Sequence, residues 1–146
     1  MKFVVNEVLE NRSRSFAGED SPQSLRKRID LLKPRDRLLI ELDLAGTNNR
    51  KRIAALLGMT PSTVTRRLQR IRRRLSDPMV VRLIDSHCLL DGELRQMAVE
   101  HFLADLSVAE IAAKHGLAPA AVRRKIAAVR WWARGHAVRN PRGINP

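Results

Sequence analysis

Apolar residues recur at helical spacing along most of this chain, between short polar segments rich in Gly, Pro, Ser, Thr and Asn. The clearest stripe is Val64, Leu68, Ile71 and Leu75, at positions i, i+4, i+7 and i+11. This spacing predicts a helix with one buried face that begins after Thr60-Pro61. No alternating run of β-branched residues predicts a strand, so the pattern indicates an all-α fold.

Further helices are expected in the first half of the chain. Ser21-Pro22 can open a helix that reaches about Lys33, and Pro34 can open the next. A turn over residues 46–49 precedes a helix over 50–57, which either Asn48 or Asn49 can cap. The residues predicted to point inward from the first two of these helices are Leu25, Ile29, Leu32, Leu38, Leu39 and Leu42.

The second half of the chain has similar signals. Asp77-Pro78 predicts the start of a helix that links the halves, and Asp91-Gly92 is expected to close it. Residues 93–104 predict the next helix, and Ser107 with Glu110 matches the S-x-x-E capping box for another. Pro119 predicts a long last helix. The inward residues are expected to be Val80, Leu83, Ile84, Leu90, Leu94, Met97, Ala98, Phe102, Val122, Ile126 and Val129.

The chain also repeats itself. Residues 53–72, IAALLGMTPSTVTRRLQRIR, align without a gap with residues 111–130, IAAKHGLAPAAVRRKIAAVR, and eight positions are identical. One structural unit is therefore expected twice. Paired alanines at 54–55 and 112–113 allow close helix contact, and Gly58 and Gly116 can form the turns, which is typical of a helix-turn-helix.

The predicted architecture is two tandem helix-turn-helix units joined by a linker helix. Its expected parts are an N-terminal segment over 1–20, a first helix-turn-helix domain over 21–76, the linker helix over 77–91, a second helix-turn-helix domain over 92–134 and a basic flexible tail over 135–146.

The net charge of +13 is unevenly distributed. Residues 50–82 hold ten Lys and Arg against one acidic residue, and residues 107–146 hold eight against one. Residues 83–106 instead hold one basic residue against five acidic ones. Two basic blocks that coincide with the repeats indicate a polyanionic partner, and with helix-turn-helix units that partner is expected to be double-stranded DNA.

Other features narrow the class of protein. The single cysteine, Cys88, excludes an internal disulfide, and neither a signal peptide nor an apolar run near 18 residues is visible. We therefore expect a cytoplasmic, nucleoid-associated protein without a membrane partner. No pattern predicts an enzyme, a metal site or a cofactor, and the oligomeric state is left open.

The helix that begins at Pro61 has polar residues at its outward positions. Hydroxyl groups can contact bases or phosphates, an arginine can bind guanine in two places, and a glutamine can pair with adenine. Arginines further along the helix are expected to contact phosphates, which position a protein without reading sequence. The predicted base-reading residues of the first unit are Ser62, Thr63, Thr65, Arg66 and Gln69.

The second unit has fewer candidate readers, because Ala120 and Ala121 offer only methyl groups. Arg123 and Arg124 are the predicted base-reading residues, and this unit could instead bind protein. The predicted phosphate-binding residues of both units are Arg50, Lys51, Arg52, Arg67, Arg70, Arg72, Arg73, Arg74, Lys114, Lys125 and Arg130.

Three groups of residues have competing interpretations. Trp131 and Trp132 could stack on nucleobases, but tryptophans at this spacing more often cover a core. His87, Cys88 and His101 lack the paired spacing of metal ligands. Asp85, Asp91 and Glu93 have no nearby nucleophile and are expected on the surface of the linker or paired with arginines.

The stretch over 34–75, PRDRLLIELDLAGTNNRKRIAALLGMTPSTVTRRLQRIRRRL, resembles region 4 of the bacterial sigma-70 family, and residues 92–132 resemble a weaker second copy. The resemblance implies that Ser62, Thr63, Thr65 and Arg66 read a promoter −35 element. It also implies docking on the flap of the RNA polymerase β subunit. No region 2, which melts the −10 element, is visible.

These observations predict a sequence-specific, double-stranded DNA-binding transcription regulator with tandem helix-turn-helix units acting at promoters. One alternative is an adaptor, with one unit on DNA and the other on RNA polymerase or a partner regulator. Another is the DNA-binding subunit of a recombinase or transposase.

Overall fold

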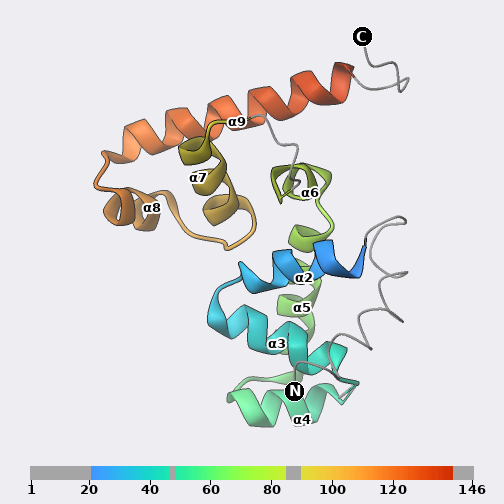
Figure 1. Ribbon diagram of the computed structural model, residues 1–146. Coiled ribbons are helices and arrows are strands. Elements are labelled where there is room, and N and C mark those ends of the chain that lie inside the picture. The colour runs from blue at the N-terminus through green and yellow to red at the C-terminus, as the bar shows by residue number, and fades with distance from the viewer. Residues whose placement is uncertain (1–20, 47–48, 85–89, 140–146) are drawn as a thin grey trace. The chain divides into compact units, whose positions relative to one another are not determined.

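The computed structural model describes residues 21–46, 49–84 and 90–139 (Figure 1). Within these ranges the chain forms helices and no strand, which confirms the all-α prediction. The expectations for residues 1–20, Asn48, Asp85, His87, Cys88 and the tail beyond Arg139 lie outside the described residues. The helices are α2 (Pro22–Asp30), α3 (Pro34–Leu44), α4 (Arg50–Leu57), α5 (Pro61–Leu75), α6 (Pro78–Ile84), α7 (Gly92–Phe102), α8 (Val108–His115) and α9 (Pro119–Arg139).

The chain divides into two compact units, residues 1–86 and 87–146. The first contains α2 to α6 and the second α7 to α9. The segment expected as a linker helix over 77–91 contains α6, which packs on α2 and α5 within the first unit. Val80 and Leu83 of α6 are buried.

The helix starts follow from local hydrogen bonding. The side chains of Ser21, Asn49 and Thr60 accept hydrogen bonds from the first turns of α2, α4 and α5. Ser107 and Glu110 form both bonds of the predicted capping box. Each such bond satisfies a backbone N–H that has no partner within its helix.

Two glycines form the turns between the paired helices. Gly58 and Gly116 end α4 and α8 with φ of +63° and +64°, a conformation that costs an L-residue with a Cβ atom about 1–2 kcal/mol. Each turn lets the next helix cross the previous one, so that α4 packs on α5 and α8 packs on α9.

The first unit has an aliphatic core in which the predicted stripe of α5 is fully buried. Ile53 of α4 and Leu39 of α3 are buried as well. Arg28 of α2 is also inside: its guanidinium donates a hydrogen bond to the backbone oxygen of Leu75, at the end of α5. Burial lowers the pKa of Arg28 to about 10.

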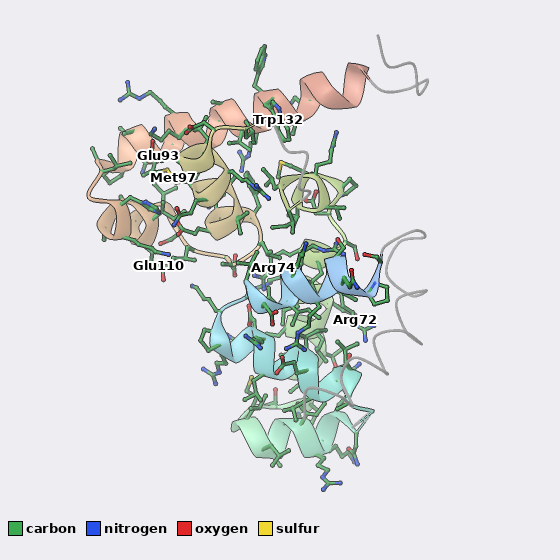
Figure 2. The ribbon with its side chains drawn as sticks, in the orientation of Figure 1. Arg72, Arg74, Glu93, Met97, Glu110 and Trp132 are labelled. Atoms are coloured by element: carbon green, nitrogen blue, oxygen red, sulfur yellow. The ribbon has the colours of Figure 1, made fainter. Side chains whose placement is uncertain are left out.

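The second unit has a smaller core. Its centre is formed by Met97 of α7, Ile111 and Ala112 of α8, and Val122 and Ile126 of α9. Figure 2 labels Met97 on α7, the helix that packs on both α8 and α9. The inward positions predicted for the last helix are therefore confirmed, including Val129.

Several predicted details are wrong. Leu38 is 45% exposed, because α3 turns Asp36, Leu39, Ile40 and Asp43 inward instead. Asp91 opens α7 rather than closing the preceding helix, since its carboxylate accepts hydrogen bonds from the backbone N–H groups of Glu93 and Leu94.

The small-residue contact and the helix ends also differ from expectation. Ala54 and Ala112 are buried, but Ala55 and Ala113 are exposed, so only one alanine of each pair packs between helices. Helix α2 ends at Asp30 rather than near Lys33, and α9 continues to Arg139, past the expected start of the tail at 135.

Candidate nucleic-acid interface

One side of α5 is free of core contacts. Its buried stripe leaves Ser62, Arg66, Gln69 and Arg73 exposed at i, i+4, i+7 and i+11 on the opposite side. We call these four residues the recognition face of α5. They extend over about 16 Å, at 1.5 Å of rise per residue, so the face is long enough to cross a DNA groove.

Hydroxyl groups are linked to one another at the start of α5. Thr60 Oγ1 lies 2.8 Å from Thr63 Oγ1 and 3.2 Å from Ser62 Oγ. Thr65 is half-buried, and its Oγ1 donates to the backbone oxygen of Pro61 at 3.1 Å. The side chains of Ser62 and Thr63 are exposed, and their hydroxyls contact that of Thr60. The hydroxyl of Thr65 is instead bound to a backbone oxygen of its own helix.

The cations of α4 and α5 that were predicted to bind phosphate comprise an exposed group, an ion-paired group and Arg67. Lys51, Arg52, Arg70 and Arg73 are exposed. Arg67 is half-buried, with its Nη1 3.8 Å from the sulfur of Met59. The four exposed cations can reach a polyanion without breaking any contact within the described residues.

The second group forms ion pairs with two aspartates of α3 that are buried. Arg50 Nη1 and Arg72 Nη2 each lie 2.5 Å from a carboxylate oxygen of Asp43, and Arg74 Nη2 lies 2.7 Å from Asp36. Figure 2 labels Arg72 and Arg74. These arginines fasten α4 and α5 to α3, a role that sequence reasoning missed.

A signal for this role was present in the sequence. Asp36 and Asp43 lie at i and i+7 of α3, on the same side as Leu39 and Ile40. An acidic residue on an apolar helical stripe requires a cationic partner when it is buried. The arginines of the basic block were candidates for that partner.

The second unit has a comparable buried carboxylate. Glu100 of α7 accepts hydrogen bonds from Lys114 at 2.6 Å and His115 at 2.7 Å, both at the end of α8. Burial by itself would raise the pKa of Glu100, but these two partners outweigh it and lower the pKa below its ordinary value. Lys114, which was predicted to bind phosphate, thus forms an ion pair within its own unit.

The remaining cations of α9 have varied surroundings. Arg123 and Arg124 are exposed. Lys125 Nζ lies 3.2 Å from Glu93 of α7, and the guanidinium carbon of Arg130 lies 5.4 Å from the ring centroid of Phe102. Arg123 and Arg124 are therefore the two predicted readers that the structure leaves accessible in this unit.

The two long helices differ at aligned positions. Ala127 and Ala128 of α9 take the places of Gln69 and Arg70 of α5. No Ser, Thr, Asn or Gln occurs between residues 119 and 139. The polar readers of the first unit thus have no counterpart on α9 except arginine.

The structure also describes part of the candidate metal ligands and both tryptophans. His101 Nδ1 lies 3.1 Å from the backbone oxygen of Leu106, and the described residues contain no group of three potential metal ligands. Trp131 is 77% exposed, so it does not cover the core, while Trp132 is half-buried. In the part of the chain that the structure covers, no helix is long and apolar enough to cross a membrane.

Comparison with known families finds a match within the first unit. Residues 23–75, from α2 to the end of α5, match the family model of sigma-70, region 4. The predicted likeness to this family is therefore confirmed for this segment, whose helices have the helix-turn-helix arrangement. Searches of curated proteins and of solved structures found no match.

Proposed function

We propose that this protein is a transcription regulator that binds double-stranded DNA in a sequence-specific manner, with α5 as its recognition helix. The observation that carries the proposal is the exposed recognition face of α5 within a segment matching sigma-70, region 4. In such units the second helix enters the major groove and its N-terminal side chains meet base edges.

The side chains of the proposed interface make two kinds of contact with DNA. Ser62, Thr63, Arg66 and Gln69 contact bases, because guanidinium and amide groups bind guanine and adenine edges in two places. The exposed cations contact phosphates and set the register of the helix on DNA. These are Lys51, Arg52, Arg70 and Arg73.

The ion-paired arginines have a different part in this proposal. Arg50, Arg72 and Arg74 hold α4 and α5 on α3, so they fix the angle at which the recognition face is presented. Base readout depends on that angle, because a bidentate contact tolerates little misorientation. They support DNA binding without being its main phosphate contacts.

Selection from a random library of duplex DNA tests this function. At near-physiological salt this chain is expected to enrich one motif, and copies of that motif are expected upstream of genes. The protein itself is expected in the cytoplasm, associated with the nucleoid. Tight binding without an enriched motif would contradict sequence-specific readout by α5. Two spaced half-sites would show that α9 reads bases as well.

A second function is favoured by the outer side of α9. With alanines in place of Gln69 and Arg70, this helix is poorly equipped to read bases. The chain would then act as an adaptor, with its first unit on DNA and its second on RNA polymerase or a partner regulator. Co-purification of polymerase subunits that survives nuclease treatment would support this function.

A further inference from the structure

The largest exposed apolar side chain in the described part of the chain is Trp131 on α9. Ala120, Arg124 and Ala127 lie on the same line of the helix surface, at i, i+4 and i+7, and Trp131 follows at i+11. All four are exposed, and Arg134 is exposed beside them. We call these five residues the Trp131 face.

Charge and composition indicate what this face binds. Helix α9 contains no acidic residue, so the arginines around Trp131 favour an anionic partner. The alanines of this face are small and leave the indole of Trp131 exposed, so an apolar group of a partner can pack against it. Tryptophan and arginine, with tyrosine, are the residues enriched among those that carry the binding energy of protein interfaces.

The same observations argue against duplex DNA as the occupant. Trp131 lies about 18 Å along the helix from Pro119, so beside a major groove about 12 Å wide it would meet the phosphates and not the base edges. It stands at the position of Arg73 in α5, so an exposed cation of the first unit is replaced by an indole. The face also lacks hydroxyl and amide groups, which commonly contact phosphates and bases.

We propose that the Trp131 face binds an acidic polypeptide segment that places an apolar side chain against the indole. Arg124 and Arg134 pair with the carboxylates of that segment, on either side of the apolar contact. This inference rests on the proposed adaptor function and deepens it, because it names the surface and the chemistry of the partner.

A displayed library of random 16-residue peptides, selected on the whole chain, tests the proposal. Enriched peptides are expected to combine Asp or Glu with at least one large apolar residue. Their affinity should fall at least tenfold for Trp131→Ala and severalfold for Arg124→Ala. In a Trp132→Phe background, where Trp131 is the sole tryptophan, peptide binding should shift the indole emission to shorter wavelength.

Controls separate this inference from DNA binding. Trp131→Ala should retain the helical content of the wild type, because the side chain is exposed, and should retain the affinity for duplex DNA selected by α5. Arg124→Ala gives an independent second variant. The proposal is overturned if no peptide distinguishes the wild type from Trp131→Ala. It is also overturned if that variant instead loses tenfold in affinity for random duplex DNA, which would make the face a nucleic-acid surface.

Discussion

Arg72 Nη2, in the last turn of α5, lies 2.5 Å from Oδ2 of Asp43, an aspartate of α3 that is buried in the first unit. The other oxygen of the same carboxylate pairs with Arg50 of α4. One buried charge therefore joins all three helices that form and support the candidate interface. Glu100 has an analogous position in the second unit, where it pairs with two residues of α8.

Asp43→Asn is expected to destabilise the protein by about 2 kcal/mol. Removing one partner of a buried ion pair typically costs about 3–5 kcal/mol, but Arg50 and Arg72 are partly exposed, which weakens the effect. Urea unfolding followed by circular dichroism measures the change. Asp30→Asn, which removes two exposed ion pairs, to Arg26 and to Arg37, is the control. Equal losses in the two variants would contradict the role of Asp43.

Two adjacent arginines should respond differently to substitution. Arg72→Ala is expected to lower the unfolding free energy, because it leaves Asp43 with one fewer cation, whereas Arg73→Ala should leave stability unchanged within about 0.5 kcal/mol. Thermal unfolding of the two variants gives the comparison. A loss of stability in Arg73→Ala as large as in Arg72→Ala would contradict the assignment of Arg73 to the exposed face.

Arg66→Ala and Arg73→Ala should change DNA binding in distinct ways. Loss of a base contact at Arg66 is expected to cost about 1–3 kcal/mol and relax preference at one base pair. Loss of a phosphate contact at Arg73 should weaken all sequences alike and reduce the slope of log K against log salt by about 1. Titrations with the selected site and its single-base variants, at several salt concentrations, measure both effects. An unchanged base preference in Arg66→Ala would show that Arg66 does not contact a base.

The second unit should lose stability in acid. The pKa of Glu100 is lowered in the folded state, so its contribution is fully present above its ordinary value of 4.5 and is lost as the pH falls through the lower folded value. Both tryptophans of the chain lie in this unit, so indole fluorescence during urea unfolding reports on it. In Glu100→Gln the loss of stability below pH 4.5 should be smaller, and an identical acid dependence would rule out this cause.

Gly58→Ala is expected to destabilise the first unit by about 1–2 kcal/mol, because the backbone of an alanine is strained at positive φ. The space around the Cβ position is open, so the cost is conformational and not steric. Gly135→Ala is the matched control: it lies within α9, also in open space, and should stabilise by about 0.5–1 kcal/mol. Chemical denaturation of both variants tests the contrast in sign.

Much of the local structure of this protein follows directly from its sequence. The caps at Ser21, Thr60 and Ser107, the left-handed turns at Gly58 and Gly116 and the buried stripe of α5 follow from interactions within a few residues. The same is true of the basic blocks and of the likeness of the first unit to sigma-70, region 4. Such features were predictable because each has its cause nearby in the chain.

The tertiary structure alone decided which charged residues turn inward and which stay available. Asp43 and Arg72 are 29 residues apart in the chain, and Arg28 meets the end of α5 from a distance of 47 residues. A charged residue on a helical stripe is ordinarily solvated, and its burial becomes favourable only when folding brings a partner to it. The sequence therefore identified the basic helices, while the packing of α3 against α4 and α5 separated the arginines that hold the fold from those that face outward.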